Sequence, residues 1–170
     1  NRSSAGSATI FLNDVGPVLE KAGLDRLKTY VGRYQSWPTW VHAARALQEL
    51  QGLVYPDYDL TDWIALAKRL HRITPQGRVV PDYDMRIAEP MKEPAPDVDM
   101  WPAWMALGDA PTLLLRGALS DILSAEAAKE MVKRRPVTKL TTIARVGHAP
   151  ALDEPQSQRA IEAFLKTLHP

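Results

Sequence analysis

The last third of the chain alternates between short apolar runs and helical patterns, and this alternation restricts the possible fold more than any other feature. One apolar run covers residues 111–117 and a second covers 139–145. A helix starting at Ser124 separates them, and another with Pro155 in its first turn follows the second run. Strand, helix, strand, helix implies two parallel strands joined by a right-handed crossover. Parallel sheets are buried on both faces, so the sequence predicts an α/β fold.

A third strand is predicted near the start of the chain. Residues 8–12 form a short β-branched and aromatic run, and residues 13–17 (Asn-Asp-Val-Gly-Pro) end it as a turn. Three strands make a poor parallel sheet alone, because such a sheet needs cover on both faces. We therefore expect further strands from outside residues 1–170. The chain does not begin with Met, which fits a fragment of a longer protein.

The middle of the chain, residues 17–107, is expected to be a set of short helices broken by turns. Apolar side chains recur there at helical spacing, and Gly52 closes the first clear pattern. Residues 78–98 show no clear period. The expected N-cap residues are Ser36 for the first helix, Thr61 or Asp62 for the second, and Asp99 for a short last helix.

The charge balance argues against several classes of partner. The chain has 21 Lys and Arg against 20 Asp and Glu, which leaves a formal net charge of +1. So small a charge gives no electrostatic drive toward nucleic acid or anionic membranes. No apolar run approaches the roughly 18 residues of a membrane helix, and the chain starts without the apolar core of a signal peptide. A cytoplasmic protein with a small-molecule substrate is the default expectation.

Two residues suited to acid–base chemistry follow the two C-terminal strands. Asp121 comes shortly after the run 111–117, and His148 comes shortly after the run 139–145. Parallel strands deliver both loops to one sheet edge, where ligands of open α/β sheets bind. Histidine can take and return a proton near neutral pH, and a carboxylate facing its second ring nitrogen fixes the tautomer. His148 is therefore the expected general base and acid, and Asp121 the expected orienting carboxylate.

Each of these residues also has a structural interpretation that stays open. Asp121 could cap the helix that starts at Ser124, since capping is a common role of aspartate. His148 could be a turn residue. Asp14 is an alternative acid, because it too follows a predicted strand, although a turn is its preferred interpretation.

The tryptophans of the middle region are candidates for a substrate pocket. Aromatic side chains bury large areas both in pockets and in cores. Trp101 and Trp104 stand near the return to the predicted sheet, so pocket contact and core packing both remain open for them. The chain has no cysteine, and its histidines have no partner at metal-ligand spacing. We expect no metal site and no cofactor.

Three segments carry a resemblance to a known family: residues 12–17 (LNDVGP), 115–124 (LRGALSDILS) and 147–155 (GHAPALDEP). They resemble the C-terminal half of an α/β-hydrolase of the single-domain esterase and carbon–carbon-bond hydrolase type. The resemblance implies three regions, namely the sixth core strand with the entry to the cap at 1–16, a helical cap at 17–107, and the C-terminal part of the core at 108–170.

The same resemblance implies a nucleophile–His–Asp triad whose first member lies outside this chain. In this family the order is nucleophile, acid, histidine, so the nucleophile is expected upstream of Asn1, in a missing N-terminal half of the same protein. The implied activity is cleavage of an ester or an activated carbon–carbon bond in a small, largely apolar substrate. Two alternatives stay open: an epoxide hydrolase or dehalogenase with an Asp nucleophile, and a non-catalytic remnant that binds a ligand or forms homo-oligomers.

Overall fold

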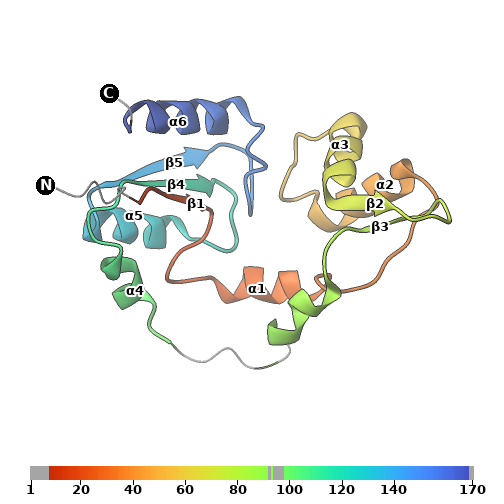
Figure 1. The fold of residues 1–170 in the computed structure, drawn as a ribbon, viewed down its shortest axis with the longest axis horizontal. Coiled ribbons are helices and arrows are strands. Elements are labelled where there is room, and N and C mark those ends of the chain that lie inside the picture. The colour runs from red at the N-terminus through yellow and green to blue at the C-terminus, as the bar shows by residue number, and fades with distance from the viewer. Residues whose placement is uncertain (1–7, 92, 94–97, 169–170) are drawn as a thin grey trace, which may run out of the picture. The chain divides into compact units, whose positions relative to one another are not determined.

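The computed structural model describes residues 8–91, 93 and 98–168, and the chain divides into two compact units. The first, here called the sheet unit, combines Asn1–Gly23 with Val98–Pro170. The second, the helical unit, is Leu24–Asp97. Residues 1–7, with which the predicted strand-and-entry region begins, lie outside the described residues. Figure 1 labels the elements of both units.

The sheet unit contains a parallel sheet of β1 (Ile10–Asn13), β4 (Thr112–Gly117) and β5 (Thr138–Ile143) in the order β1-β4-β5. In Figure 1 the three arrows lie side by side and point the same way. Asn13 pairs with Leu115, and Gly117 pairs with Ile143, so the three carboxyl ends come close together. The predicted α/β class is confirmed, with strand ends shifted by at most two residues from those expected.

Two helices cover opposite faces of this sheet, α5 (Ala125–Arg134) and α6 (Pro155–Lys166) (Figure 1). The helix α5 starts where the sequence predicted, and Ser124 is its N-cap, because the Ser124 hydroxyl accepts a hydrogen bond from the Ala127 N–H at 3.2 Å. A short helix, α4 (Trp101–Ala106), precedes β4, and the Asp99 carboxylate accepts from the Trp101 N–H at 2.9 Å. The predicted helix starts at Ser124 and Pro155 are therefore correct.

The core of the sheet unit forms where α4 and α5 meet one face of β4. Successive residues of a strand point to opposite faces, so Leu114 faces this cluster while Leu113 and Leu115 face away from it. All three leucines are at most 1% exposed. The buried members of the cluster are Trp104, Leu114, Leu123, Ala127, Ala128 and Met131. This packing fixes the carboxyl end of β4 and the loop that follows it.

The helical unit is built from short elements. Its helices are α1 (Lys21–Lys28, which starts just before the unit), α2 (Trp40–Gln51), α3 (Leu60–Leu70) and the 3₁₀ helix η1 (Met85–Met91). A two-stranded antiparallel sheet joins β2 (His71–Ile73) to β3 (Val79–Pro81). Three residues per strand are too few to show a period of two, so the hairpin was missed in the sequence. None of the described helices has the length and apolar content to cross a bilayer.

Two predicted N-caps of the helical unit are wrong. Thr39, not Ser36, caps α2, and Asp59, not Thr61 or Asp62, caps α3. The Ser36 hydroxyl instead accepts a hydrogen bond from the Arg78 guanidinium at 3.0 Å. Asp62 serves as the third residue of a capping box, because its carboxylate accepts from the Asp59 N–H. Gly52 ends α2 as expected.

We expect His71 to make this chain less stable in mild acid. Burial lowers the pKa of His71 below the ordinary histidine value of about 6.5, although its hydrogen bond to Ala67 works in the opposite direction. The unfolded chain then binds a proton more readily than the folded chain, so stability is lost as the pH falls below about 6.5. Urea unfolding at pH 5.0 and 7.5 should show a larger loss for the native sequence than for His71→Leu. Equal losses in the two proteins would contradict this expectation.

Candidate active site

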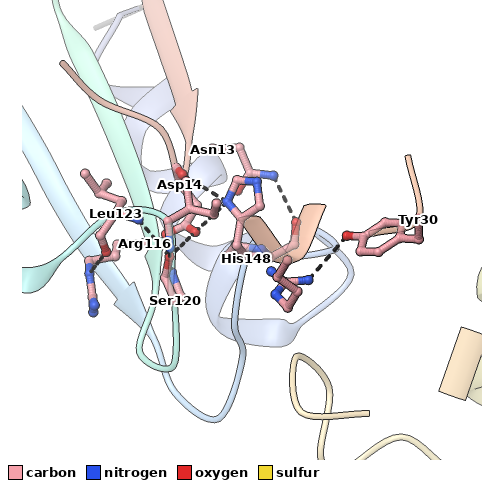
Figure 2. Close-up of polar contacts among 11 residues, drawn as sticks. Asn13, Asp14, Tyr30, Arg116, Ser120, Leu123 and His148 are labelled. Atoms are coloured by element: carbon pink, nitrogen blue, oxygen red, sulfur yellow. Dashed lines mark hydrogen bonds and ion pairs between the residues drawn. The ribbon is translucent and has the colours of Figure 1, made fainter. Parts of the chain in front are cut away.

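A carboxylate–imidazole pair lies at the carboxyl edge of the parallel sheet. Asp14 directly follows β1, and His148 lies in the loop after β5. The His148 Nδ1 atom is 2.8 Å from Asp14 Oδ2 and 3.1 Å from the Asp14 carbonyl oxygen (Figure 2). Asp14 is fully buried, whereas the His148 side chain keeps 22% of its surface exposed. The pair thus combines a buried anion with an imidazole that solvent or a ligand can reach.

Both oxygens of the Asp14 carboxylate are held by further donors. The Gly117 N–H donates to Oδ1 at 2.9 Å, and the Ser120 hydroxyl donates to Oδ2 at 2.6 Å. In Figure 2 the Asp14 side chain lies between His148 and Ser120. Hydrogen bonds to the ionised form offset the cost of burying a carboxylate. The backbone of Asp14 is in the left-handed region, with φ of 56°, which aspartate tolerates better than most residues.

These contacts set the proton arrangement of His148. Both atoms near Nδ1 belong to acceptor groups, so Nδ1 carries the hydrogen of the neutral imidazole and donates it to Asp14. The Nε2 atom then has a free lone pair. An imidazole in this tautomer can remove a proton at Nε2, and the adjacent carboxylate stabilises the imidazolium that forms. The chemistry that the geometry permits is general base and acid catalysis at Nε2.

The structure places Asp14, and not Asp121, on the Nδ1 atom of His148. In this structure the contact with the nitrogen is made by Asp14, the alternative acid of the sequence, and the orienting role expected of Asp121 stays a prediction. Asp121 does not cap α5 either, because Ser124 does. The residue of this loop that turns toward the pair is Ser120, whose oxygen also accepts from the Ile122 and Leu123 N–H groups at 3.2 and 3.1 Å. Sequence reasoning missed Ser120, since a serine in a loop carries no distinctive signal.

Backbone and amide contacts tie the three strand ends to the histidine loop. The Asn13 side-chain amide donates to the Pro150 carbonyl at 2.9 Å across 137 residues of sequence. The Leu119 N–H donates to the Val146 carbonyl at 2.9 Å, and the Ala118 N–H donates to the Ile143 carbonyl at 2.8 Å. Within the described residues the Asn13 Oδ1 atom is buried without a hydrogen-bond partner. The loop that carries His148 is thus anchored from both β1 and β4.

The two candidate pocket tryptophans make contacts with α5. Trp104 is 4% exposed, and its indole N–H donates to the Met131 carbonyl at 3.1 Å. Trp101 lies under the Arg134 guanidinium, 3.9 Å from the ring centre. Trp104 also lines a hollow of about 270 Å³ with Leu12 and Val15, next to the Asp14 turn. Trp104 is therefore packed mostly into the core of the sheet unit. Contact of Trp101 or Trp104 with a substrate stays a prediction.

Metal ligands do not gather in the part of the chain that the structure describes. No group of three or more His, Asp or Glu side chains there is arranged to hold an ion. The chain also has no cysteine.

Replacing Ser120 with alanine is expected to weaken the pair without removing it. The change deletes a hydrogen bond to a charged group and leaves two backbone N–H groups without their acceptor. We expect kcat of the complete protein to fall about 3- to 30-fold. Ser124→Ala is the matched control, because it removes a helix cap worth about 1 kcal/mol without touching Asp14. Equal effects of both changes on kcat would contradict the role of Ser120.

Gly117 leaves room for the histidine loop. A Cβ atom built at Gly117 would lie 2.3 Å from the Gly147 carbonyl oxygen and 2.5 Å from that of Val146. Gly117→Ala must therefore push the loop away from β4, and we expect a loss of about 1–3 kcal/mol in unfolding free energy. Chemical denaturation measures this loss, with the exposed Ala118→Gly as control. An unchanged unfolding free energy in Gly117→Ala would mean that the histidine loop does not pack closely against Gly117.

Comparison with known proteins finds several that are similar to this chain. No family model matches the chain. Among curated proteins it is similar to a 3-hydroxybutyrate-oligomer hydrolase of Cupriavidus necator, at 27% identity over 167 residues that cover 86% of this chain and 52% of the relative. Among solved structures it is similar to an alpha/beta hydrolase from Novosphingobium aromaticivorans, with a TM-score of 0.86 and 51% identity over 94% of this chain and 56% of that one.

A third protein is similar in fold alone. This is an E-2-(acetamidomethylene)succinate hydrolase, with a TM-score of 0.70 and 20% identity over 93% of this chain and 57% of that one. The chain therefore spans little more than half the length of each of the three proteins.

Proposed function

Because this chain belongs to the α/β-hydrolase fold family, we propose that it supplies the histidine and the acid of a nucleophile–His–Asp triad. The observation that carries the proposal is the 2.8 Å contact between the buried Asp14 carboxylate and His148 Nδ1. Under this proposal His148 is the general base and acid, and Asp14 takes the orienting role that the sequence assigned to Asp121. The protein is a hydrolase of ester or activated carbon–carbon bonds in small, largely apolar molecules.

For an ester, the proposed reaction has two halves, acylation and hydrolysis of the acyl intermediate. The Nε2 atom of His148 takes the proton of the nucleophile hydroxyl as its oxygen attacks the carbonyl carbon, and the imidazolium returns that proton to the leaving alcohol. Water then attacks the acyl intermediate while His148 takes one of its protons and returns it to the nucleophile oxygen. Asp14 stabilises the imidazolium in both halves of the reaction through its contact with Nδ1. The mechanism uses no cofactor.

We propose that the nucleophile lies outside residues 1–170. The chain covers 52% and 56% of two relatives, which leaves nearly half of each without a counterpart here. A helical unit that stands between β1 and β4 in chain order is the proposed cap of the fold. An aspartate as the nucleophile would shift the reaction toward epoxide or halide chemistry, so the nucleophile must be identified by experiment.

Ester substrates are the first class to test. The relative in Cupriavidus necator is named for the hydrolysis of 3-hydroxybutyrate oligomers, whose units join through a hydroxyl and a carboxyl group. We therefore propose short esters, oligomers of 3-hydroxy acids among them, as probes. Carbon–carbon-bond cleavage remains the second branch of the same proposal, because both reactions need the same base.

A serine-directed fluorophosphonate tests the proposal on the complete protein. We expect stoichiometric labelling of the native protein and loss of labelling in His148→Ala, because the hydroxyl reacts only with the imidazole as base. Equal labelling and equal ester turnover without His148 would overturn the assignment. Ester or epoxide turnover without labelling would instead favour an aspartate nucleophile, and binding without turnover would favour the non-catalytic alternative.

A further inference from the structure

The helical unit contains a cavity of its own. Its volume is about 220 Å³, and all its lining residues belong to the unit. A dry cavity of about 150 Å³ is already large enough to hold benzene, so this one can hold a single ring with a substituent. The apolar part of the lining comes from α2, the end of α3 and the segments around β3, with Trp37, Leu47, Leu50, Leu70, Pro81 and Ile87 among its members.

One buried polar group of the lining has an unused acceptor. His71 is 8% exposed, and its Nδ1 atom lies 2.9 Å from the Ala67 carbonyl oxygen. A carbonyl only accepts, so Nδ1 carries the hydrogen and Nε2 has a free lone pair. No hydrogen bond among the described residues uses His71 Nε2. The Trp37 ring meets the imidazole edge-on, with 5.1 Å between ring centres, and fixes its orientation.

The charge of the site favours a neutral ligand. Burial lowers the pKa of His71, which keeps the imidazole uncharged at neutral pH and preserves its acceptor. The hydroxyls of Tyr30 and Tyr83 already accept hydrogen bonds, from Arg26 and from the Gly32 N–H. Arg33 is exposed, so water screens its charge. The lining also contains the side chains of Gln35 and Gln51, and within its apolar part the imidazole of His71 offers a ligand a hydrogen-bond acceptor.

We propose that this cavity binds a small neutral alcohol or phenol, with its ring or chain against Trp37 and Leu50 and its hydroxyl donating to His71 Nε2. The His71 Nε2 acceptor has no hydrogen-bond partner among the described residues, so pairing it gives the site selectivity for molecules that carry a donor over apolar molecules of the same shape. The site is separate from the Asp14–His148 pair in its residues, so its existence does not depend on the reaction proposed above.

Calorimetric titration of the complete protein with phenol and with toluene tests the proposal. The two probes have the same shape, and phenol alone carries a hydroxyl donor. We expect His71→Leu to weaken phenol binding about 3- to 10-fold and to leave toluene binding unchanged, since one neutral hydrogen bond is lost. Leu50→Trp should abolish binding of both probes by filling the cavity; Leu50 is 38% exposed, so the larger side chain can be placed without disturbing the core.

His42→Leu is the matched control, because His42 lies on α2 at an exposed position outside the lining. It should leave both affinities unchanged. A nitrogen-15 spectrum of the native protein gives a second measurement that needs no variant: phenol, and not toluene, should shift the His71 Nε2 resonance. Phenol binding that survives Leu50→Trp, or a His71 resonance that phenol at saturation does not move, would overturn the proposal.

Discussion

Replacing His148 with alanine is expected to lower kcat of the complete protein by about 10⁴-fold or more, the usual cost of losing the base of a triad. Without the imidazole of His148, no base removes the proton of the nucleophile. No acid then protonates the leaving group. The substrate contacts that set KM are untouched, so the loss should appear in kcat. Steady-state hydrolysis of a short ester by the native protein and the variant measures the effect.

His42→Ala is the control for this experiment. His42 is an exposed histidine of α2 whose Nδ1 atom lies 2.8 Å from the Thr39 hydroxyl oxygen, so it resembles His148 in type and in having one polar partner. Turnover should stay within about twofold of the native value, because surface substitutions rarely perturb a fold. A His148→Ala protein that retains folded structure and more than a tenth of the native kcat would rule out His148 as the base.

Asp14→Asn is expected to lower kcat nearly as far, by about 10³- to 10⁴-fold. The amide cannot stabilise an imidazolium, and its NH₂ group favours the wrong histidine tautomer by donating to Nδ1. The Gly117 N–H and the Ser120 hydroxyl would both lose their charged acceptor, so some stability should be lost as well. Kinetics and denaturation of the same preparation separate the two losses.

Asp121→Asn is the matched comparison, because it makes the same chemical change one residue from Ser120. We expect its kcat to fall no more than about threefold, since the Nδ1 atom of His148 is occupied by Asp14. If Asp121→Asn is severely impaired and Asp14→Asn stays active, Asp121 is the orienting acid, as the sequence first suggested.

Much of the sheet unit was predictable from the sequence, for a clear physical reason. The runs 111–117 and 139–145 are long enough to show an apolar pattern, and Ser124 and Pro155 mark helix starts by their backbone preferences. His148 was singled out because a histidine after a buried strand must emerge at the carboxyl edge of the sheet. These inferences depend on local sequence and on the topology of parallel strands.

The contact of His148 with Asp14 rather than Asp121 was not predictable, because both carboxylates follow a predicted strand. It depends on how two turns are shaped. Asp14 takes a left-handed backbone directly at the end of β1, which turns its side chain into the sheet edge beside Gly117. In the turn after β4, the Ser120 oxygen accepts hydrogen bonds from the Ile122 and Leu123 N–H groups. The Ser120 hydroxyl in turn donates to the Asp14 carboxylate.

The errors in the helical unit have a similar origin. Ser36 is as good a cap in isolation as Thr39, and only the distant Arg78 guanidinium decides that Ser36 is used elsewhere. The strands β2 and β3 are too short for a pattern, and their pairing of His71 with Pro81 is visible only in three dimensions. Contacts between residues far apart in sequence thus settle what local preference leaves open.

The contact between Asp14 and His148 is tested most directly by proton NMR of the complete protein at low temperature. A proton shared between His148 Nδ1 and the Asp14 carboxylate should give a resonance far downfield of the amide region in the native protein. We expect this signal to disappear in Asp14→Asn and in His148→Ala, and to persist in Asp121→Asn. A signal that survives Asp14→Asn and is lost in Asp121→Asn would contradict the assignment of Asp14 as the partner of the histidine.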